Sequence, residues 1–335
     1  MAATHDGRPA GNEDVMKRWW LILLSALSLE TADARAEDWP TRPLRAIVPV
    51  AAGSLVDIVP RIVFEQLALQ LGQTIVVENR PGAGATIGAG LVAKADPDGY
   101  TVLVNSSAHT IAPSLFANLS YDPARDFAAV APLGVTPFVL VVPPAKGFRT
   151  AQDFVAAADA KRGAFNFSSL GVGTASHMSA ERFLLSTGLH AVHVPFKGGP
   201  EAMTEVITGR IDFYFVAIGA ALPYIKDGKL AALAVNSAKR SAALPDVPTI
   251  QEAGFNNAEY PTWFGLFVPA RTPREIVDKL HRETLKALQE PKVRDKLAAL
   301  GFDPMVMTPS EFDAFIVKDI AANAALVKAV GLQPQ

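Results

Sequence analysis

The chain has 335 residues, of which 50% are hydrophobic, so it is long enough for about two domains that each bury a core. Its formal net charge of -2 and the lack of a basic run give it no general attraction for nucleic acid or anionic membranes. Because the chain contains no cysteine, disulfides, thiolate nucleophiles and thiolate metal sites are excluded.

The first 36 residues are typical of an export signal. A positive start at residues 16–18 precedes an apolar segment, residues 19–29, that is too short to span a bilayer comfortably. Ala34-Arg35-Ala36 then has the small residues that signal peptidase reads. We therefore expect residues 1–36 to be an upstream extension followed by a signal peptide that is cleaved near Ala36, which places the mature protein in the periplasm. An uncleaved membrane anchor is the alternative.

Predicted strands and helices alternate after residue 40, which indicates parallel sheets covered by helices. The expected strands are 44–50, 74–78, 100–104, 138–142, one starting at 165, 193–196, 211–216, 231–236 and 263–268. The expected helices include 58–71, 151–160, 201–208, 273–289 and 309–330. The pattern restarts after residue 142 and changes near residue 263. We therefore expect two α/β lobes, with 138–142 and 263–268 as the crossing strands.

Two loops in this pattern precede helices and are rich in small residues. Residues 51–57 follow the first strand, with Pro60 expected in the first turn of the helix. Residues 168–177 carry two glycines and several hydroxyl side chains between a strand and a helix. The first N–H groups of a helix have no partners inside it and lie at the positive end of its dipole. Each loop can therefore hold an anion without a charged side chain.

Other kinds of chemistry have weaker signals in this sequence. The spacing of Gly82, Gly84 and Gly88 is one residue too long for a dinucleotide-binding loop. The histidines lack metal-ligand spacing, and the adjacent Ser176 and His177 do not form the nucleophile elbow of a hydrolase. We expect no metal, no cofactor and no catalytic residues.

Two residues, Asp57 and Trp263, each have two possible roles. Asp57 is either an N-terminal cap or a group that holds water or a ligand amino group in the cleft. Trp263 is either a core residue or a wall of the pocket.

A dozen short motifs, in order from residue 39 to the C-terminus, are shared with one known family. They include Trp39-Pro40, Glu78-Asn79-Arg80-Pro81-Gly82, Pro97-Asp98-Gly99-Tyr100, Gly171-x-Gly173-Thr174, His193-Val194-Pro195-Phe196-Lys197-Gly198, Leu244-Pro245-Asp246-Val247-Pro248-Thr249 and Thr308-Pro309-x-Glu311-Phe312. In these the chain resembles the Bug family of solute receptors, the extracytoplasmic binding subunits of tripartite tricarboxylate transporters.

The resemblance implies an α/β, two-lobed periplasmic-binding-protein fold of type II, a Venus flytrap with two hinge strands. Lobe 1 would comprise residues 37–137 and 262–335, and lobe 2 residues 138–261. The resemblance also implies a ligand held mainly by backbone amides and hydroxyls of the two loops. Carried onto this sequence, the ligand-binding residues would be Ala51, Ala52, Gly53, Asp57, Ser107, Ser168, Gly171, Gly173, Thr174, His177 and Trp263.

The implied function is capture of a small organic acid or amino acid and its delivery to the membrane subunits of the transporter. One alternative is a receptor that signals through a sensor kinase, and a less favoured one is an enzyme acting on an organic acid. No nucleic-acid partner is expected. The first loop departs from the family pattern at Ala51 and Ser54, where proline and glycine are usual. We also expect Gly173→Val to abolish ligand binding while leaving the fold nearly intact.

Overall fold

The computed structural model describes residues 1–3, 39–161, 163–196, 198–260 and 262–334. The chain divides into a unit of residues 1–39 and a unit of residues 40–335, and the elements described below all belong to the second. The expected signal peptide and its cleavage site lie outside the described residues.

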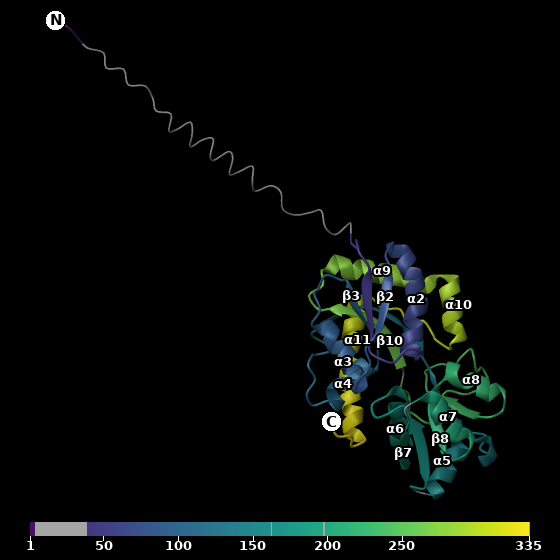
Figure 1. Cartoon of the computed structure of the whole chain (residues 1–335). Coiled ribbons are helices and arrows are strands. Elements are labelled where there is room, and N and C mark those ends of the chain that lie inside the picture. The colour runs from purple at the N-terminus through teal and green to yellow at the C-terminus, as the bar shows by residue number, and fades with distance from the viewer. Residues whose placement is uncertain (4–38, 162, 197, 261, 335) are drawn as a thin grey trace. The chain divides into compact units, whose positions relative to one another are not determined.

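Two mixed five-stranded sheets form the framework of this unit (Figure 1). In spatial order, the first sheet contains β2 (Ile75–Asn79), β1 (Leu44–Val48), β3 (Thr101–Ser106), β10 (Thr262–Pro269) and β4 (Phe127–Thr136). The second contains β7 (Ala191–Pro195), β6 (Phe165–Ser169), β8 (Phe213–Ala217), β5 (Phe138–Val142) and β9 (Ala231–Val235). Each sheet is the centre of one lobe.

The expected parallel pairing holds for β1 with β2 and β3 and for β6 with β7 and β8, but both sheets also contain antiparallel pairs. Strand β10 runs antiparallel to β3 and β4, and β5 runs antiparallel to β8 and β9. The chain leaves the first sheet between β4 and β5, at Pro137, and returns to it at β10. Each of the two predicted crossing strands therefore lies within a single sheet, with the connections at its ends.

Helices surround both sheets. With the first sheet are α2 (Leu55–Leu71), α3 (Thr86–Ala93), α4 (Ala108–Leu115), α9 (Arg274–Gln289), α10 (Pro291–Ala299) and α11 (Pro309–Ala329), and the single turn η1 (Ala83–Ala85). With the second are η2 (Pro144–Lys146), α5 (Ala151–Ala160), α6 (Ala175–Thr187), α7 (Gly199–Ile207) and α8 (Ile218–Lys226). Within the described residues, no helix has the length and apolar character needed to cross a bilayer.

Among the α-helices and strands, the sequence pattern missed α4, α8, β4 and α10. Helices α4 and α8 each contain a proline, Pro113 and Pro223, which interrupts the helical pattern. Strand β4 contains Pro132 and Gly134, which are more typical of a loop. Helix α10 is short and follows α9 after a single residue, so the two are easily taken as one helix and a loop.

The lobes are packed against each other at several points. An apolar cluster joins Ile111 and Leu115 of α4, Met178 of α6, and Leu326 and Val327 of α11. This cluster therefore links the C-terminal helix of the first lobe to the helix that follows the glycine-rich loop of the second.

Candidate functional site

The first loop runs from the end of β1 to the start of α2. Ala51, Ala52 and Gly53 are exposed, and Gly53 has a left-handed backbone with φ of 84°. The helix begins at Leu55, three residues before the predicted start. Pro60 is therefore the sixth helical residue and lies in the second turn, which corrects the expectation for its position.

Asp57 holds this loop to its surroundings. One carboxylate oxygen, Oδ2, accepts the backbone N–H of Gly53 at 2.9 Å. The other, Oδ1, accepts bonds from Arg61 Nε and Asn79 Nδ2, each at 2.9 Å. Burial by itself would raise the pKa of Asp57, but the hydrogen bonds from Arg61, Gly53 and Asn79 outweigh it and lower the pKa. Both oxygens thus have protein partners, which favours a structural role for Asp57.

The start of α2 has unused donors. Within the described part of the chain, the N–H groups of Leu55 and Val56 have no hydrogen-bond acceptor. The residue that precedes them, Ser54, makes no side-chain capping bond, and its buried Oγ has no partner. The helix therefore presents free donors next to the exposed backbone of the first loop.

The second loop joins β6 to α6 and is shaped by Thr174. The Thr174 Oγ1 donates to the carbonyl of Gly171 at 2.7 Å and accepts the N–H of His177 at 3.4 Å, so it caps the helix. Gly171 and Gly173 have φ of 117° and 77°, in the region that favours glycine. These two contacts and two conformations fix the bend of the loop.

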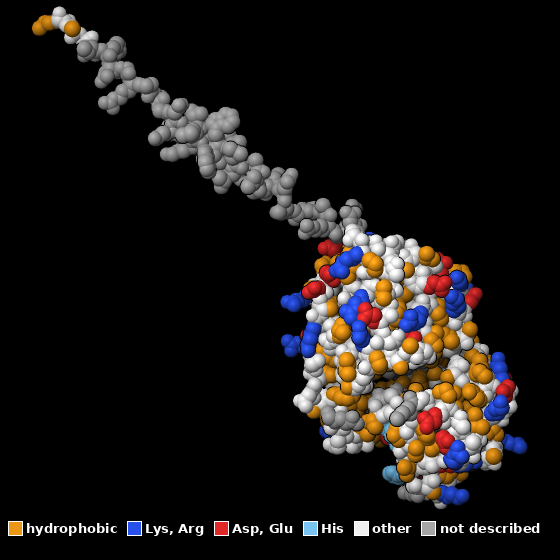
Figure 2. All heavy atoms as spheres, viewed as in Figure 1, with side chains coloured by type: hydrophobic (Ala, Val, Ile, Leu, Met, Phe, Trp, Pro, Cys, Tyr) orange, Lys and Arg blue, Asp and Glu red, His pale blue; other side chains and the backbone are white. Residues whose placement is uncertain are grey.

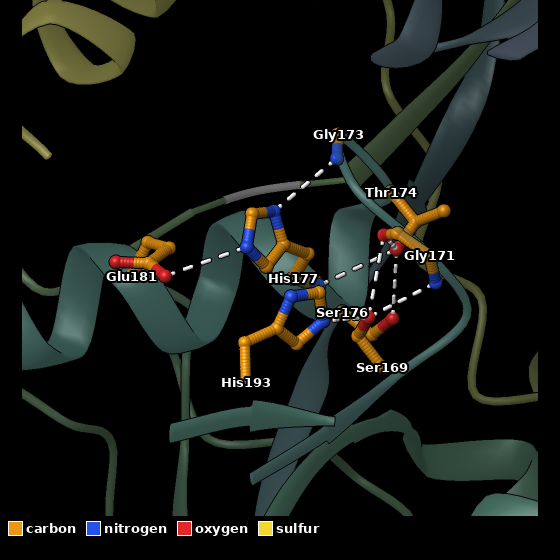
Figure 3. Close-up of polar contacts among 8 residues, drawn as sticks. All are labelled: Ser169, Gly171, Gly173, Thr174, Ser176, His177, Glu181 and His193. Atoms are coloured by element: carbon orange, nitrogen blue, oxygen red, sulfur yellow. Dashed lines mark hydrogen bonds and ion pairs between the residues drawn. The ribbon is translucent and has the colours of Figure 1, made fainter. Parts of the chain in front are cut away.

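The two glycine N–H groups are hydrogen-bonded to side chains of the same lobe (Figure 3). Gly171 donates to Ser169 Oγ at 2.9 Å, and Gly173 donates to His177 Nδ1 at 3.2 Å. Because Nδ1 accepts, the ring proton of neutral His177 lies on Nε2, which is 3.4 Å from Glu181 Oε1. The glycines that the resemblance implicates as donors are therefore already hydrogen-bonded in this structure.

Free donors lie just beyond, at the start of α6. Among the described residues, no acceptor pairs with the N–H groups of Ala175 and Ser176. The start of α6 thus matches the start of α2 in the other lobe, where two N–H groups are also free. Both ends carry the positive part of a helix dipole.

Both helix starts border the same apolar cluster, which contains Phe154, Phe167 and Phe183 of the second lobe. Leu55 from the first lobe and Ala175 from the second each pack against this cluster. On the face shown in Figure 2, the surface is hollowed between the elements of the first sheet and those of the second, and hydrophobic side chains edge the hollow. The predicted pairing of the two loops is consistent with this packing.

The remaining predicted site residues lie deeper. Ser168 is fully buried on β6, and its Oγ has no partner. Ser107 is buried before α4, and its N–H donates to the carbonyl of Trp263 at 3.2 Å. Trp263 itself is 0% exposed, packs edge-on against Phe312, and donates from Nε1 to Asp319 at 2.9 Å. Trp263 was expected to be either a core residue or a wall of the pocket. The structure supports the core residue, because no part of the ring is exposed to a ligand.

Sequence reasoning missed three residues that shape the second loop: Ser169, Glu181 and His193. Glu181 is four residues after His177, a spacing that brings two helical side chains together. Ser169 is two residues after the core residue Phe167, so it had to share that face of the strand. His193 was predicted to lie in a strand and in one of the family motifs, without a role in the loop. In the described residues no cluster could hold a metal ion.

These features together are those of a two-lobed solute receptor, with free N–H groups at a helix start in each lobe. A family model described as the tripartite tricarboxylate transporter family receptor matches residues 59–332. BugT of Bordetella pertussis is 33% identical over 302 residues, which cover 90% of this chain and 93% of BugT. The chain belongs to the tripartite tricarboxylate transporter receptor family, also known as the Bug family.

Solved structures agree with this assignment. Rpa4515 of R. palustris, solved with adipate, has a TM-score of 0.81 and 29% identity, and the match covers 89% of this chain and 100% of that one. MatC (Rpa3494) from Rhodopseudomonas palustris, solved with bound malate, has a TM-score of 0.77 and 32% identity, with coverage of 86% and 100%. The protein is therefore a solute receptor of a transport system, and the enzyme hypothesis is set aside.

Proposed function

We propose that this protein captures a small carboxylate-containing metabolite between its two lobes in the periplasm and delivers it to the membrane subunits of a tripartite tricarboxylate-type transporter. The observation that carries the proposal is the matched pair of free donors, Leu55 and Val56 in one lobe and Ala175 and Ser176 in the other. The adipate and malate bound by two similar receptors support a dicarboxylate as the ligand.

In the proposed mechanism the ligand bridges the lobes. One carboxylate accepts hydrogen bonds from the start of α2, and a second polar group accepts them from the start of α6. Hydrogen bonds to a charged group contribute about 1.5–3 kcal/mol each, and the helix dipoles add about 0.3–1 kcal/mol at each end. Neither lobe can make all of these contacts alone, so a ligand that reaches both favours the closed arrangement.

The proposed ligand contacts of the first loop are backbone groups of the exposed residues Ala51 and Ala52. Gly53 and Thr174 help to hold the loops, because the Gly53 N–H is bound to Asp57 and the Thr174 hydroxyl to Gly171 and His177. Ser168 is fully buried and stays a prediction. We assign Asp57, Gly171, Gly173 and His177 to holding the loops in shape, because their polar groups already bind each other or nearby residues. Ser107 stays a prediction.

We further propose that lobe 1 comprises residues 37–137 and 262–335, and lobe 2 residues 138–261. The membership of the two sheets supports these bounds. Export with cleavage near Ala36 fits a periplasmic receptor, and the sequence of residues 16–36 supports it.

Thermal unfolding of ligand-stripped protein with a panel of organic acids and amino acids tests the proposal. A ligand that binds only the folded state at 100 times its Kd stabilises it by about 2.7 kcal/mol, which raises the Tm measurably. We expect a shift with at least one small mono- or dicarboxylate. The absence of any shift across the panel would contradict the proposed function.

A further inference from the structure

His193 lies on β7, at the edge of the second sheet, beside the strand that leads into the second loop. In the parallel pairing of β6 and β7, His193 is opposite Phe167. Its ring stacks on Phe167, with centroids 4.9 Å apart, and on His177, with centroids 4.1 Å apart. The imidazole is therefore held between the core of the lobe and the first turn of α6.

The same imidazole reaches the loop through Ser169. His193 Nε2 is 2.5 Å from Ser169 Oγ, a short hydrogen-bond distance. That oxygen accepts the N–H of Gly171 at 2.9 Å and is 3.2 Å from the Gly171 carbonyl oxygen (Figure 3). Ser169 is fully buried, so its hydroxyl depends on these partners for its orientation.

The second glycine is tied to the same pair of rings. Gly173 donates its N–H to Nδ1 of His177, the imidazole that stacks on His193. The N–H groups of both loop glycines are thus held by groups in direct contact with His193. Beyond Gly173 lies the start of α6, with the free N–H groups of Ala175 and Ser176.

We propose that His193 is a positioning residue for ligand binding: through Ser169 and His177 it fixes Gly171 and Gly173, and thereby aims the free donors at the start of α6. The inference rests on the proposed function of that helix start. His193 itself does not need to touch the ligand.

The charge state of His193 is compatible with this role. Burial, together with the nearby His177, lowers the pKa of His193 to about 4, although Glu181 acts in the opposite direction. At neutral pH the ring is uncharged, so it can stack on a second imidazole without repulsion and still hydrogen-bond to Ser169.

The test compares three variants. His193→Phe keeps an aromatic ring for stacking but removes the hydrogen bond to Ser169. His193→Gln removes the ring but keeps a group that can hydrogen-bond to Ser169. His190→Phe is the matched control, because His190 is exposed and lies three residues earlier in the chain.

Two quantities are measured on each purified protein: amide hydrogen exchange at Gly171 and Gly173 without ligand, and the Kd for malate and adipate by calorimetry. We expect His193→Phe to speed exchange at Gly171 and to weaken binding by about tenfold, the effect of one lost hydrogen bond, with the Tm little changed. His193→Gln should restore slow exchange at Gly171, and His190→Phe should behave as wild type.

Unchanged Gly171 exchange and unchanged Kd in His193→Phe would overturn the inference, as would an equal loss of affinity in His190→Phe. If wild type binds neither acid nor any other carboxylate, the proposed function fails. Exchange at Gly171 then still decides whether His193 fixes the loop.

Discussion

Leu115 of α4 lies where a side chain on Gly173 would extend. A Cβ added to Gly173 would be 2.2 Å from Leu115 Cδ1, which is far closer than two carbon atoms can approach. This contact joins the second-lobe loop to a first-lobe helix. It also corrects the expectation that Gly173→Val would leave the fold nearly intact, because a branched side chain would meet both Leu115 and an unfavourable φ of 77°.

Gly173→Ala should therefore lower the free energy of unfolding by about 1–3 kcal/mol, from the left-handed backbone together with the clash. Adding Leu115→Ala should relieve the clash but not the backbone strain. A double-mutant cycle in urea would measure the coupling between the two sites. Strictly additive effects would show that the two residues do not interact as described.

Asp57→Asn should loosen the first loop without removing a ligand contact. The amide cannot accept from Gly53, Arg61 and Asn79 as the carboxylate does, so we expect a loss of about 1–3 kcal/mol in stability. Because its pKa is lowered in the folded protein, Asp57 stabilises the fold at neutral pH, and this stabilisation is lost as the pH falls below 3.8.

Urea unfolding at pH 7 and pH 3 compares the two proteins. The difference in free energy of unfolding between wild type and Asp57→Asn should be smaller at pH 3 than at pH 7. A gap of equal size at both values would show that the ionised carboxylate is not what stabilises the loop.

Gly219 marks a second close approach between the lobes. A Cβ on this residue of α8 would lie 2.4 Å from the carbonyl oxygen of Leu300, in the connection between α10 and α11. Because a backbone oxygen cannot turn aside as a side chain can, Gly219→Ala should destabilise the protein by about 1–3 kcal/mol.

Gly199→Ala is the matched control for this variant. Gly199 begins α7, and a Cβ added to it would meet no atom within 4 Å, so alanine should be neutral or slightly stabilising there. In thermal unfolding, Gly219→Ala should have a clearly lower Tm than Gly199→Ala. Equal Tm values would contradict the packing described between α8 and residue 300.

Two histidines make the fold sensitive to mild acid. Burial lowers the pKa of His109 to about 4, and burial with His177 does the same for His193, from an ordinary value of 6.5. Between pH 6.5 and pH 4 the unfolded chain binds protons that the folded protein does not, so stability decreases as the pH is lowered through this window. Above pH 6.5 neither residue changes the stability.

His109→Phe should flatten this dependence, since His109 is fully buried among aromatic rings. From pH 6.5 to pH 4.5, wild type should lose about 2–3 kcal/mol more than the variant. The carboxyls of Asp303, Asp313 and Asp319, whose pKa is raised by partial desolvation, act in the opposite direction but are common to both proteins. If the stability of wild type and of His109→Phe changed with pH by the same amount, the prediction would be contradicted.

The local pattern was enough to place both loops and their helices, because small residues and glycines between an apolar strand and an apolar helical repeat favour a tight strand-to-helix turn. It could not assign partners to the loop N–H groups. Ser169 and His177 bind Gly171 and Gly173 only because β6, β7 and α6 meet in the folded lobe.

Trp263 illustrates a different limit. An aromatic residue on a strand faces one side of the sheet or the other, and β10 has irregular register at two places against β4. Alternation along the sequence therefore could not decide between core and pocket. The ring lies in the core because Phe312 and Asp319 of α11, which lie far along the chain from β10, cover it.

In the proposed function, the cleft binds a carboxylate through free backbone donors. Calorimetric titration of ligand-stripped protein with malate and adipate, each compared with its uncharged dimethyl ester, tests it directly. We expect saturable binding of one ligand per chain for an acid and no detectable binding of its ester. Equal binding of acid and ester, or no binding of any small carboxylate, would contradict it.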